Sequence, residues 1–319
     1  MKAMLVHELG GALQLDQSPR PEPGPGQALI RVRACGVNFA DTLMVQGKYQ
    51  EKHDLPFAPG MEIAGVVEQV GESVSLPLGS RVAALCGHGG FAEYALAPAS
   101  SCVPIPDKMP DTDAAAFLVA YGTSHVALDY RVNLKPGENL LVLGAAGGVG
   151  LTAVEIGKLM GANVIACARG QKKLEFAARA GADHLIDSSA DDIREKVKSL
   201  GGADVVYDPV GGDQFKAAMR ACNPEARLLP LGFASGDVPQ IPANILLVKN
   251  LTVHGFYWGA YAHIKPAVLA NSLTQLFTWY VEGRLQPHIS NIIPLAEANE
   301  ALRLLKSREA TGKVVIEVE

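Results

Sequence analysis

The sequence predicts an α/β protein in which a doubly wound domain with a parallel sheet is inserted between the two parts of a β-rich domain. Two observations carry this prediction. Short apolar runs separated by proline and glycine fill the N-terminal third, whereas strands alternate with helices from residue 139 onward. A chain of 319 residues is also long enough for about two domains, each with its own core. We place the β-rich domain at 1–118 plus 259–319 and the inserted domain at 119–258.

The β-rich part begins with five expected strands, at 4–6, 28–34, 63–70, 81–85 and 92–97. Each is an alternating or continuous apolar run bounded by turn-forming residues, such as the proline-rich segment at 19–26. The period then changes, and residues 114–128 are predicted to form a helix. Near the C-terminus we expect two helices, at 266–282 and 296–306, and a last strand at 313–318.

The inserted part alternates strands and helices. Expected strands occupy 139–144, 163–168, 184–187, 205–208, 227–231 and 251–255. Expected helices occupy 148–160, 171–180, 190–200 and 213–221. Several of the strands are uninterrupted apolar runs, which is typical of a parallel sheet covered on both faces. Strand and helix alternate at the spacing that a doubly wound sheet requires.

The charge balance limits the range of partners. Lys and Arg total 28 against 33 Asp and Glu, which gives a net charge of −5. Because the chain also lacks a basic run, we expect no binding to nucleic acids or anionic membranes. No apolar stretch approaches the roughly 20 residues of a membrane span, and we see no export signal. Five widely spaced cysteines indicate a reduced, cytoplasmic protein.

A glycine-rich turn follows the first strand of the inserted domain. It reads Gly144, Ala145, Ala146, Gly147, Gly148, Val149 and Gly150, with Ala145 in place of the first glycine of a G-x-G-x-x-G pattern. A strand before the turn, a helix after it and further β/α units are the context of a dinucleotide site. Gly147 would let the backbone approach a pyrophosphate at the helix N-terminus, and Gly150 would let the helix pack on the sheet. The alternative is a glycine-rich turn without a ligand.

The end of the second strand indicates which dinucleotide binds. NAD sites usually have an acidic residue there, about 20 residues after the glycines. This chain has no acid before Glu175 and instead carries the run Arg169, Gly170, Gln171, Lys172 and Lys173. A 2′-phosphate would be held by Arg169 and by a lysine such as Lys173. We therefore expect NADP(H), although a solvated basic helix start would look the same.

Five short motifs in order resemble the medium-chain dehydrogenase/reductase superfamily, and the resemblance covers essentially the whole chain. It is closest to the zinc-free quinone oxidoreductase branch. The resemblance implies a Rossmann domain that binds the nucleotide, inserted in a catalytic domain related to the GroES fold. The motifs are Gly36-Val-Asn38-Phe-Ala-Asp41, Pro56-Phe-Ala-Pro59-Gly60, Glu62-Ile-Ala-Gly-Val-Val-Glu68, the turn Ala145–Gly150 and Thr311-Gly-Lys313-Val-Val.

The zinc-dependent alcohol dehydrogenases of this superfamily differ at the ligand positions. Where they have Gly-x-Cys-x-x-Asp this chain has Asn38, and where they have Gly-His-Glu it has Met61. The third ligand position aligns with Val119. An amide, a thioether and an aliphatic side chain cannot supply the three ligands of a catalytic zinc. The four-cysteine lobe that holds structural zinc in those relatives is also missing, so we expect no metal.

Chemistry without a Lewis acid favours acceptors that are already electrophilic, namely quinones and the β-carbon of enones or enoyl thioesters. The resemblance implies that Tyr49 faces the nicotinamide and donates a proton. Asn38 would form a hydrogen bond with the cofactor ribose or the substrate, and Asp41 would orient the Asn38 loop. Thr123 would bind near the carboxamide. The alternatives are an ordinary loop tyrosine and an ordinary helix threonine.

Further cofactor contacts also follow from the resemblance. Lys313 would reach the cofactor or, alternatively, form a structural ion pair. Ser188 follows the third strand, where relatives often have an aromatic residue or histidine. The remaining contacts are the turn Leu231, Gly232, Phe233 and Ala234 and the segment Gly255, Phe256 and Tyr257.

These observations predict an NADPH-dependent reductase of quinones or related enones, which are small apolar electrophiles. An enoyl-thioester reductase stays open, although the acidic balance does not support the cationic patch that it needs. A protein that binds NADPH without turnover is a second alternative. Members of this family commonly dimerise through edge strands, here 251–255, so we expect a homodimer.

Overall fold

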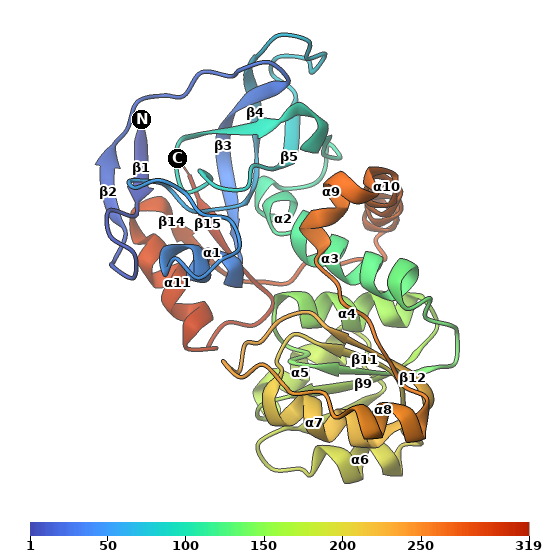
Figure 1. Ribbon diagram of the computed structural model, residues 1–319. Helices are drawn as coiled ribbons and strands as arrows, with labels where there is room; N and C mark the ends of the chain where they lie inside the picture. The colour runs from blue at the N-terminus through green and yellow to red at the C-terminus, as the bar shows by residue number, and fades with distance from the viewer. Residues whose placement is uncertain (319) are drawn as a thin grey trace. The chain divides into compact units, whose positions relative to one another are not determined.

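The computed structural model describes residues 1–318 and divides into two compact units. Unit 1 comprises Met1–Val119 and Pro287–Glu319, and unit 2 comprises Ala120–Gln286. Figure 1 shows that the parallel sheet lies in unit 2, while unit 1 contains the N-terminal and C-terminal strands. The predicted fold class is confirmed. Glu319, the last residue of the expected β-rich domain, lies outside the described residues.

The second division between the units falls after Gln286, whereas the sequence analysis placed it after residue 258. Residues 259–286 pack on unit 2 through side chains that no local pattern reveals. Nδ1 of His125 lies 2.9 Å from Oγ of Ser272. The N–H of Gln286 donates to Oε1 of Glu155 at 2.6 Å, and the Tyr121 hydroxyl donates to Oε2 of the same carboxylate at 2.7 Å.

Unit 1 is built on a seven-stranded sheet. Its strand order is β14-β15-β3-β4-β5-β7, and β6 also pairs with β3. The apolar side chains of these strands form one core with those of α11 (Ala298–Lys306), which buries Ala298, Ala301 and Leu302 at helical spacing. A separate antiparallel pair joins β1 (Lys2–Leu5) to β2 (Gln14–Gln17). The sheet strands are β3 (Gln27–Val37), β4 (Glu62–Val70), β5 (Arg81–Leu85), β6 (Tyr94–Pro98), β7 (Cys102–Pro104), β14 (Ile289–Pro294) and β15 (Lys313–Glu317).

The helix predicted at 114–128 is wrong as a single element. The chain instead forms α2 (Asp111–Ala115), α3 (Leu118–His125) and a π-helix at Val126–Arg131. The carbonyl of Ala115 lies against Gly36 of β3, so close that a Cβ at Gly36 would be 2.0 Å from the oxygen. This contact fixes the end of α2 on the sheet, and α3 starts anew. The short helix α1 (Phe39–Val45) was not predicted.

Unit 2 contains a six-stranded parallel sheet with the order β10-β9-β8-β11-β12-β13. All six strands were predicted; β9 and β10 have the predicted bounds, and the other four differ by a few residues. The chain leaves β8 toward β9 on one side and returns to β11 on the other, which creates a switch point between β8 and β11. The strands are β8 (Asn139–Leu143), β9 (Asn163–Ala168), β10 (His184–Asp187), β11 (Ala203–Asp208), β12 (Cys222–Pro230) and β13 (Thr252–Val253).

Helices cover the sheet of unit 2, and α4 lies particularly close to it. Gly150, Ala153 and Gly157 follow one face of α4, and a Cβ at Gly157 would be 2.4 Å from Cδ2 of Leu140 in β8. Small residues on this face therefore set the distance between helix and strand. The helices are α4 (Gly148–Leu159), α5 (Gln171–Arg179), α6 (Ile193–Ser199), α7 (Gly212–Ala221), α8 (Ala243–Lys249), α9 (Tyr261–Ile264) and α10 (Pro266–Val281).

Two further findings concern the whole described chain. All five cysteines are free, and four of them are buried. None of the helices found in residues 1–318 combines the length and the apolar character of a membrane span.

Candidate functional site

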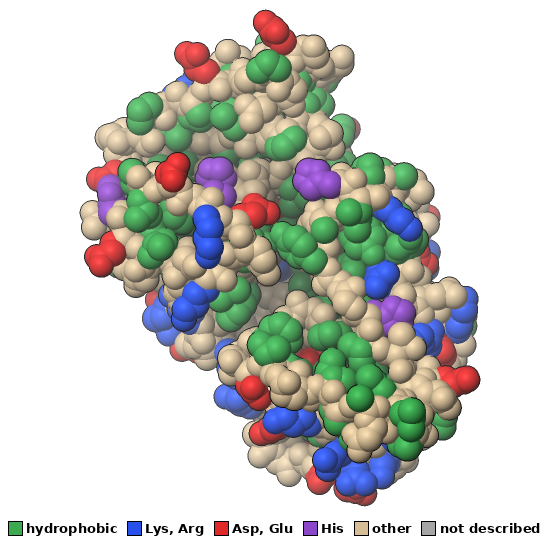
Figure 2. Space-filling model, viewed as in Figure 1, with side chains coloured by type: hydrophobic (Ala, Val, Ile, Leu, Met, Phe, Trp, Pro, Cys, Tyr) green, Lys and Arg blue, Asp and Glu red, His purple; other side chains and the backbone are tan. Residues whose placement is uncertain are grey.

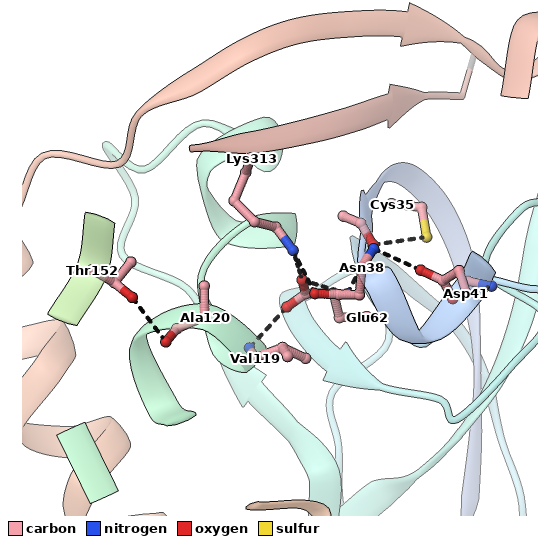
Figure 3. A network of polar contacts seen from close by, with 10 residues as sticks. Cys35, Asn38, Asp41, Glu62, Val119, Ala120, Thr152 and Lys313 are labelled. Atoms are coloured by element: carbon pink, nitrogen blue, oxygen red, sulfur yellow. Dashed lines mark hydrogen bonds and ion pairs between the residues drawn. The ribbon is translucent and has the colours of Figure 1, made fainter. Parts of the chain in front are cut away.

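Three strand ends of unit 1 bring three polar side chains together. β3 pairs antiparallel with β4 and with β15, so that Gly36 lies opposite Glu62 on one side and opposite Val315 on the other. The C-terminal end of β3 therefore meets the beginnings of both neighbours. Asn38 follows β3, Glu62 opens β4 and Lys313 opens β15. Figure 3 shows these side chains pointing toward one another, and we call Asn38, Glu62 and Lys313 the polar cluster.

The polar cluster consists of a buried ion pair and an amide that forms hydrogen bonds with both charged groups. Nζ of Lys313 donates to Oε1 of Glu62 at 2.6 Å and to Oδ1 of Asn38 at 2.7 Å. The two charged side chains are only 7% and 1% exposed. Removal of either partner would leave a buried charge without its counter-ion, which is far more costly than loss of a surface pair. The structural ion pair considered for Lys313 is therefore present.

The Asn38 carboxamide has one orientation in this cluster. Its Nδ2 donates to Oε1 of Glu62 at 2.9 Å and to the carbonyl of Gly36 at 3.2 Å, which uses both amide hydrogens. Its Oδ1 accepts from Lys313 and has one further lone pair. Asn38 can therefore accept a hydrogen bond from a ligand but has no hydrogen left to donate.

The three positions that align with zinc ligands lie together. The N–H of Val119 donates to Oε2 of Glu62 at 2.9 Å, and Met61 precedes Glu62 directly. The geometry thus supports the alignment of Val119, while the side chains present do not fit a zinc ion. Within residues 1–318, no group of three or more His, Cys, Asp or Glu side chains is arranged to hold a metal.

Asp41 joins two turns beside the polar cluster. Its Oδ2 accepts from the N–H of Asn38 at 2.7 Å and its Oδ1 from the N–H of Gly60 at 3.0 Å. Gly60 has φ +95°, and a Cβ there would lie 2.6 Å from the Phe91 ring. Burial raises the pKa of Asp41 to about 7, although these N–H groups and Lys313 act in the opposite direction. Asp41 therefore links the Asn38 turn to the Gly60 turn, and its orienting role in the reaction stays a prediction.

Tyr49 lies after the end of α1 and is half-buried against the core of unit 1. The turn before it contains Gly47 at φ +65°, whose N–H donates to the carbonyl of Met44 at 2.9 Å. Nearby, burial raises the pKa of the Cys35 thiol, which keeps it protonated. This is consistent with Cys35 as a core residue.

The glycine turn, residues 144–150, lies in unit 2 between β8 and α4. A Cβ at Gly150 would be 2.1 Å from the carbonyl oxygen of Gly144, so α4 can start here only with glycine. Gly147 differs, because a Cβ there would meet that same oxygen at 3.4 Å, an ordinary contact. The N–H groups of the first turn of α4 have no acceptor within the helix. The turn therefore fits a pyrophosphate.

The end of β9 carries the residues expected to select the cofactor. Arg169 is exposed and Gly170 precedes α5 with φ +79°. An acid that the sequence analysis missed also lies here, because Oδ1 of Asp187 at the end of β10 accepts from the N–H of Gly170 at 2.9 Å. Ser189 donates to the same oxygen through its hydroxyl at 2.6 Å, and this bond holds the pKa of Asp187 below its usual range. Asp187 at the end of β10 thus stabilises the turn that follows β9.

The other expected cofactor residues lie at strand ends of unit 2. Ser188 donates its N–H to the carbonyl of Ala168, which keeps it beside the β9 turn. The N–H of Leu231 donates to the carbonyl of Asp208 at the end of β11. Burial raises the pKa of Asp208 to about 6, against the hydrogen bonds from Gly211 and Val210. The segment 232–234 follows Leu231, the segment 255–257 follows β13, and Thr123 lies half-buried on α3.

Comparisons with known proteins agree with this architecture. Residues 24–107 match the family described as alcohol dehydrogenase GroES-like domain, and residues 148–274 match the family described as zinc-binding dehydrogenase. The quinone oxidoreductase-like protein 2 homolog of Nematostella vectensis is 42% identical over 99% of this chain and 88% of that protein.

Solved structures extend the comparison. The quinone oxidoreductase of Thermus thermophilus, also solved in complex with NADPH, is 34% identical with a TM-score of 0.86 over 99% of this chain and 100% of that one. The Escherichia coli quinone oxidoreductase complexed with NADPH is 28% identical with a TM-score of 0.92 over the same shares. The sequence, the fold and the polar cluster thus agree, and the chain belongs to the quinone oxidoreductase-like branch of the medium-chain dehydrogenase/reductase family.

Proposed function

We propose that this chain catalyses the NADPH-dependent, zinc-independent reduction of quinones, or of related enones, by hydride transfer. NADPH supplies the hydride when it is bound. The glycine turn, Arg169 and Lys173 would bind its phosphates. Asn38, Asp41 and Tyr49 of unit 1 and Thr123 of unit 2 would serve the reaction. The five free thiols support a reducing compartment such as the cytoplasm.

The polar cluster is the observation that carries this proposal. Asn38, Met61 and Val119 occupy the positions aligned with zinc ligands, and the buried Lys313–Glu62 pair occupies the space beside them. A site with this chemistry has no Lewis acid for the alkoxide of an alcohol. Quinones and enones are electrophilic without one, and hydrogen bonds are sufficient for their developing oxyanion.

The hydrogen bonds of these side chains support a different role for each. Because Asn38 can only accept, it would bind a hydroxyl of the ligand, such as a ribose hydroxyl, rather than an oxyanion. Tyr49 carries a phenol, a group that can donate a proton to an enolate or a hydroquinone oxygen. Asp41 is committed to two backbone N–H groups and would hold the loop rather than act as a base.

Initial rates with NADPH and NADH test the proposal, each with a simple quinone and a simple enone after treatment with a chelator. We expect a rate that is unaffected by the chelator and faster with NADPH. Loss of activity on chelation, or absence of turnover with both acceptors, would contradict it. Tyr49→Phe should lower kcat about 100-fold while NADPH binding is unchanged. Tyr94→Phe, on β6 below Arg20, is the matched control and should behave as wild type.

A further inference from the structure

The chain passes between the units twice, and the first crossing is anchored on both sides. Val119 is the last residue of unit 1, and its N–H donates to Oε2 of Glu62 at 2.9 Å. Ala120 is the first residue of unit 2, and its carbonyl accepts from the hydroxyl of Thr152 at 3.1 Å. Figure 3 shows both contacts, with Thr152 and Ala120 at one end of the network and Val119 beside Glu62. One peptide therefore connects a side chain of the polar cluster to helix α4.

Glu62 is the group that links this crossing to Asn38. One of its oxygens binds Val119, while the other accepts from Nδ2 of Asn38 and Nζ of Lys313. The carboxyl group is 1% exposed, so water does not compete for these bonds. A displacement of the Val119 N–H must either break its bond to Glu62 or turn the carboxylate, which also binds Asn38.

We propose that Glu62 is a positioning residue for the reaction proposed above, on which this inference rests. It fixes the position of the Asn38 carboxamide relative to the peptide between Val119 and Ala120, at which unit 2 begins. A change in the backbone at the crossing is thereby transmitted to the amide oxygen that accepts from the ligand.

The donors around Glu62 explain why an amide cannot take its place. Lys313, Asn38 and Val119 all donate to it, and a carboxylate accepts through both oxygens. Glutamine has a single acceptor oxygen and an NH₂ group. If its oxygen faces Val119, the NH₂ group faces two donors; if its oxygen faces the polar cluster, the bond to Val119 is lost. Glu62→Gln must therefore break the link on one side.

Glu155 provides a matched control on the other side of the same crossing. It is a half-buried glutamate, and it accepts from the Tyr121 hydroxyl and the Gln286 N–H. In Glu155→Gln the oxygen can keep the Gln286 N–H, and the hydroxyl of Tyr121 can accept from the new NH₂ group. This variant makes the same chemical change without touching the polar cluster.

The test is a double-mutant cycle of Glu62→Gln and Asn38→Ala under the conditions of the proposed reaction. We expect Glu62→Gln to lower kcat roughly 10- to 100-fold with the Kd of NADPH unchanged. The isotope effect with NADPH deuterated at the transferred position should rise. Because Glu62 acts through Asn38, the double variant should be no slower than Asn38→Ala. Glu155→Gln should match wild type in rate and isotope effect.

A second readout does not depend on turnover. Hydrogen exchange at the Val119 amide should become about tenfold faster in Glu62→Gln, since a hydrogen bond to a charged acceptor is lost or weakened. If Glu62→Gln does not fold, Glu62→Gln combined with Lys313→Met removes both charges of the buried pair and takes its place. Additive rate losses, a wild-type rate in Glu62→Gln, or unchanged exchange at Val119 would overturn the inference. Absence of turnover in the wild-type protein would refute the proposed function instead. Hydrogen exchange at Val119 would then be the only test of whether Glu62 holds the Val119 amide.

Discussion

The polar cluster of unit 1 and the glycine turn of unit 2 achieve close packing by opposite means. The cluster depends on what its side chains carry, because an ammonium, a carboxylate and an amide satisfy one another in a buried space. The turn depends on the absence of a side chain, because a Cβ at Gly150 would overlap the backbone of Gly144. The first site tolerates no unpaired charge, and the second tolerates no added atom at Gly150. Substitutions in the two regions should therefore fail in different ways.

Lys313→Met should have the largest effect on stability. It leaves the Glu62 carboxylate buried without a counter-ion, and we expect a loss of about 3–5 kcal/mol in the free energy of unfolding. Denaturant unfolding of the purified variant measures this. Lys313→Met with Glu62→Gln should recover most of the loss because neither charge of the pair remains. A single variant that costs less than about 1 kcal/mol would mean that the pair behaves like an exposed one.

Gly150→Ala and Gly147→Ala should separate folding from binding within one turn. At Gly150 the methyl group would lie 2.1 Å from the Gly144 oxygen, so we expect a loss of about 1–3 kcal/mol and of NADPH binding. At Gly147 the contact is 3.4 Å and φ is −81°, so the melting temperature should not change. NADPH affinity should nevertheless fall at least about tenfold, because the methyl group occupies space needed by the pyrophosphate. Thermal denaturation and fluorescence titration measure the two effects, and wild-type affinity in Gly147→Ala would place the phosphates elsewhere.

Arg169→Glu should weaken the preference for NADPH over NADH at the turn after β9. We expect the Kd of NADPH to rise about tenfold, a change of about 1.4 kcal/mol, while that of NADH changes little. The reason is repulsion between the carboxylate and the 2′-phosphate. Arg194→Glu on α6 makes the same charge change on another exposed helix and serves as control. Equal losses in both variants, measured by titration, would indicate a general effect of charge.

Leu247→Asp should affect assembly rather than folding. The strand β13 is an edge of the parallel sheet, and α8 before it leaves Leu247 and Val248 77% and 73% exposed. Figure 2 shows hydrophobic side chains gathered on this part of unit 2. We propose that they cover a dimer contact and expect light scattering to show a dimer for wild type and a monomer for Leu247→Asp. Val281→Asp, at a side chain 69% exposed on α10, should remain dimeric, and a monomeric wild type would refute the dimer.

The sequence could predict the parts of the fold that repeat a local pattern. β9 has the predicted bounds because it contains a continuous, buried apolar run at 164–168. β10 is a short run bounded by turns, and it also has the predicted bounds. The helix at 114–128 was wrong because its interruption depends on Gly36, a residue of another strand. The strand β14 was missed because its parallel pairing with β15 supplies the order that its mixed polar sequence does not.

The same distinction between local and distant residues applies to the candidate site. The glycine turn could be found because all its residues are consecutive. Glu62 was noticed only as part of a motif, because its partners come from positions 38, 119 and 313. Its role could have been inferred from the predicted strands, since antiparallel neighbours of one strand begin where that strand ends. Asp187 was not predicted for a similar reason. The acidic residue of a dinucleotide site is expected at the end of β9, whereas Asp187 ends β10 and contacts Gly170 across the sheet.

The two bonds of Glu155 have a consequence for the modular design of the molecule. Tyr121 lies next to the first residue of unit 2 and Gln286 is its last, and both donate to one carboxylate. The inserted segment thus leaves its host almost where it entered. A host interrupted in this way loses little chain entropy when the insert folds, because the gap that must be closed is short. We therefore expect that unit 2 can be exchanged for the corresponding segment of a relative, with cuts at residues 120 and 286.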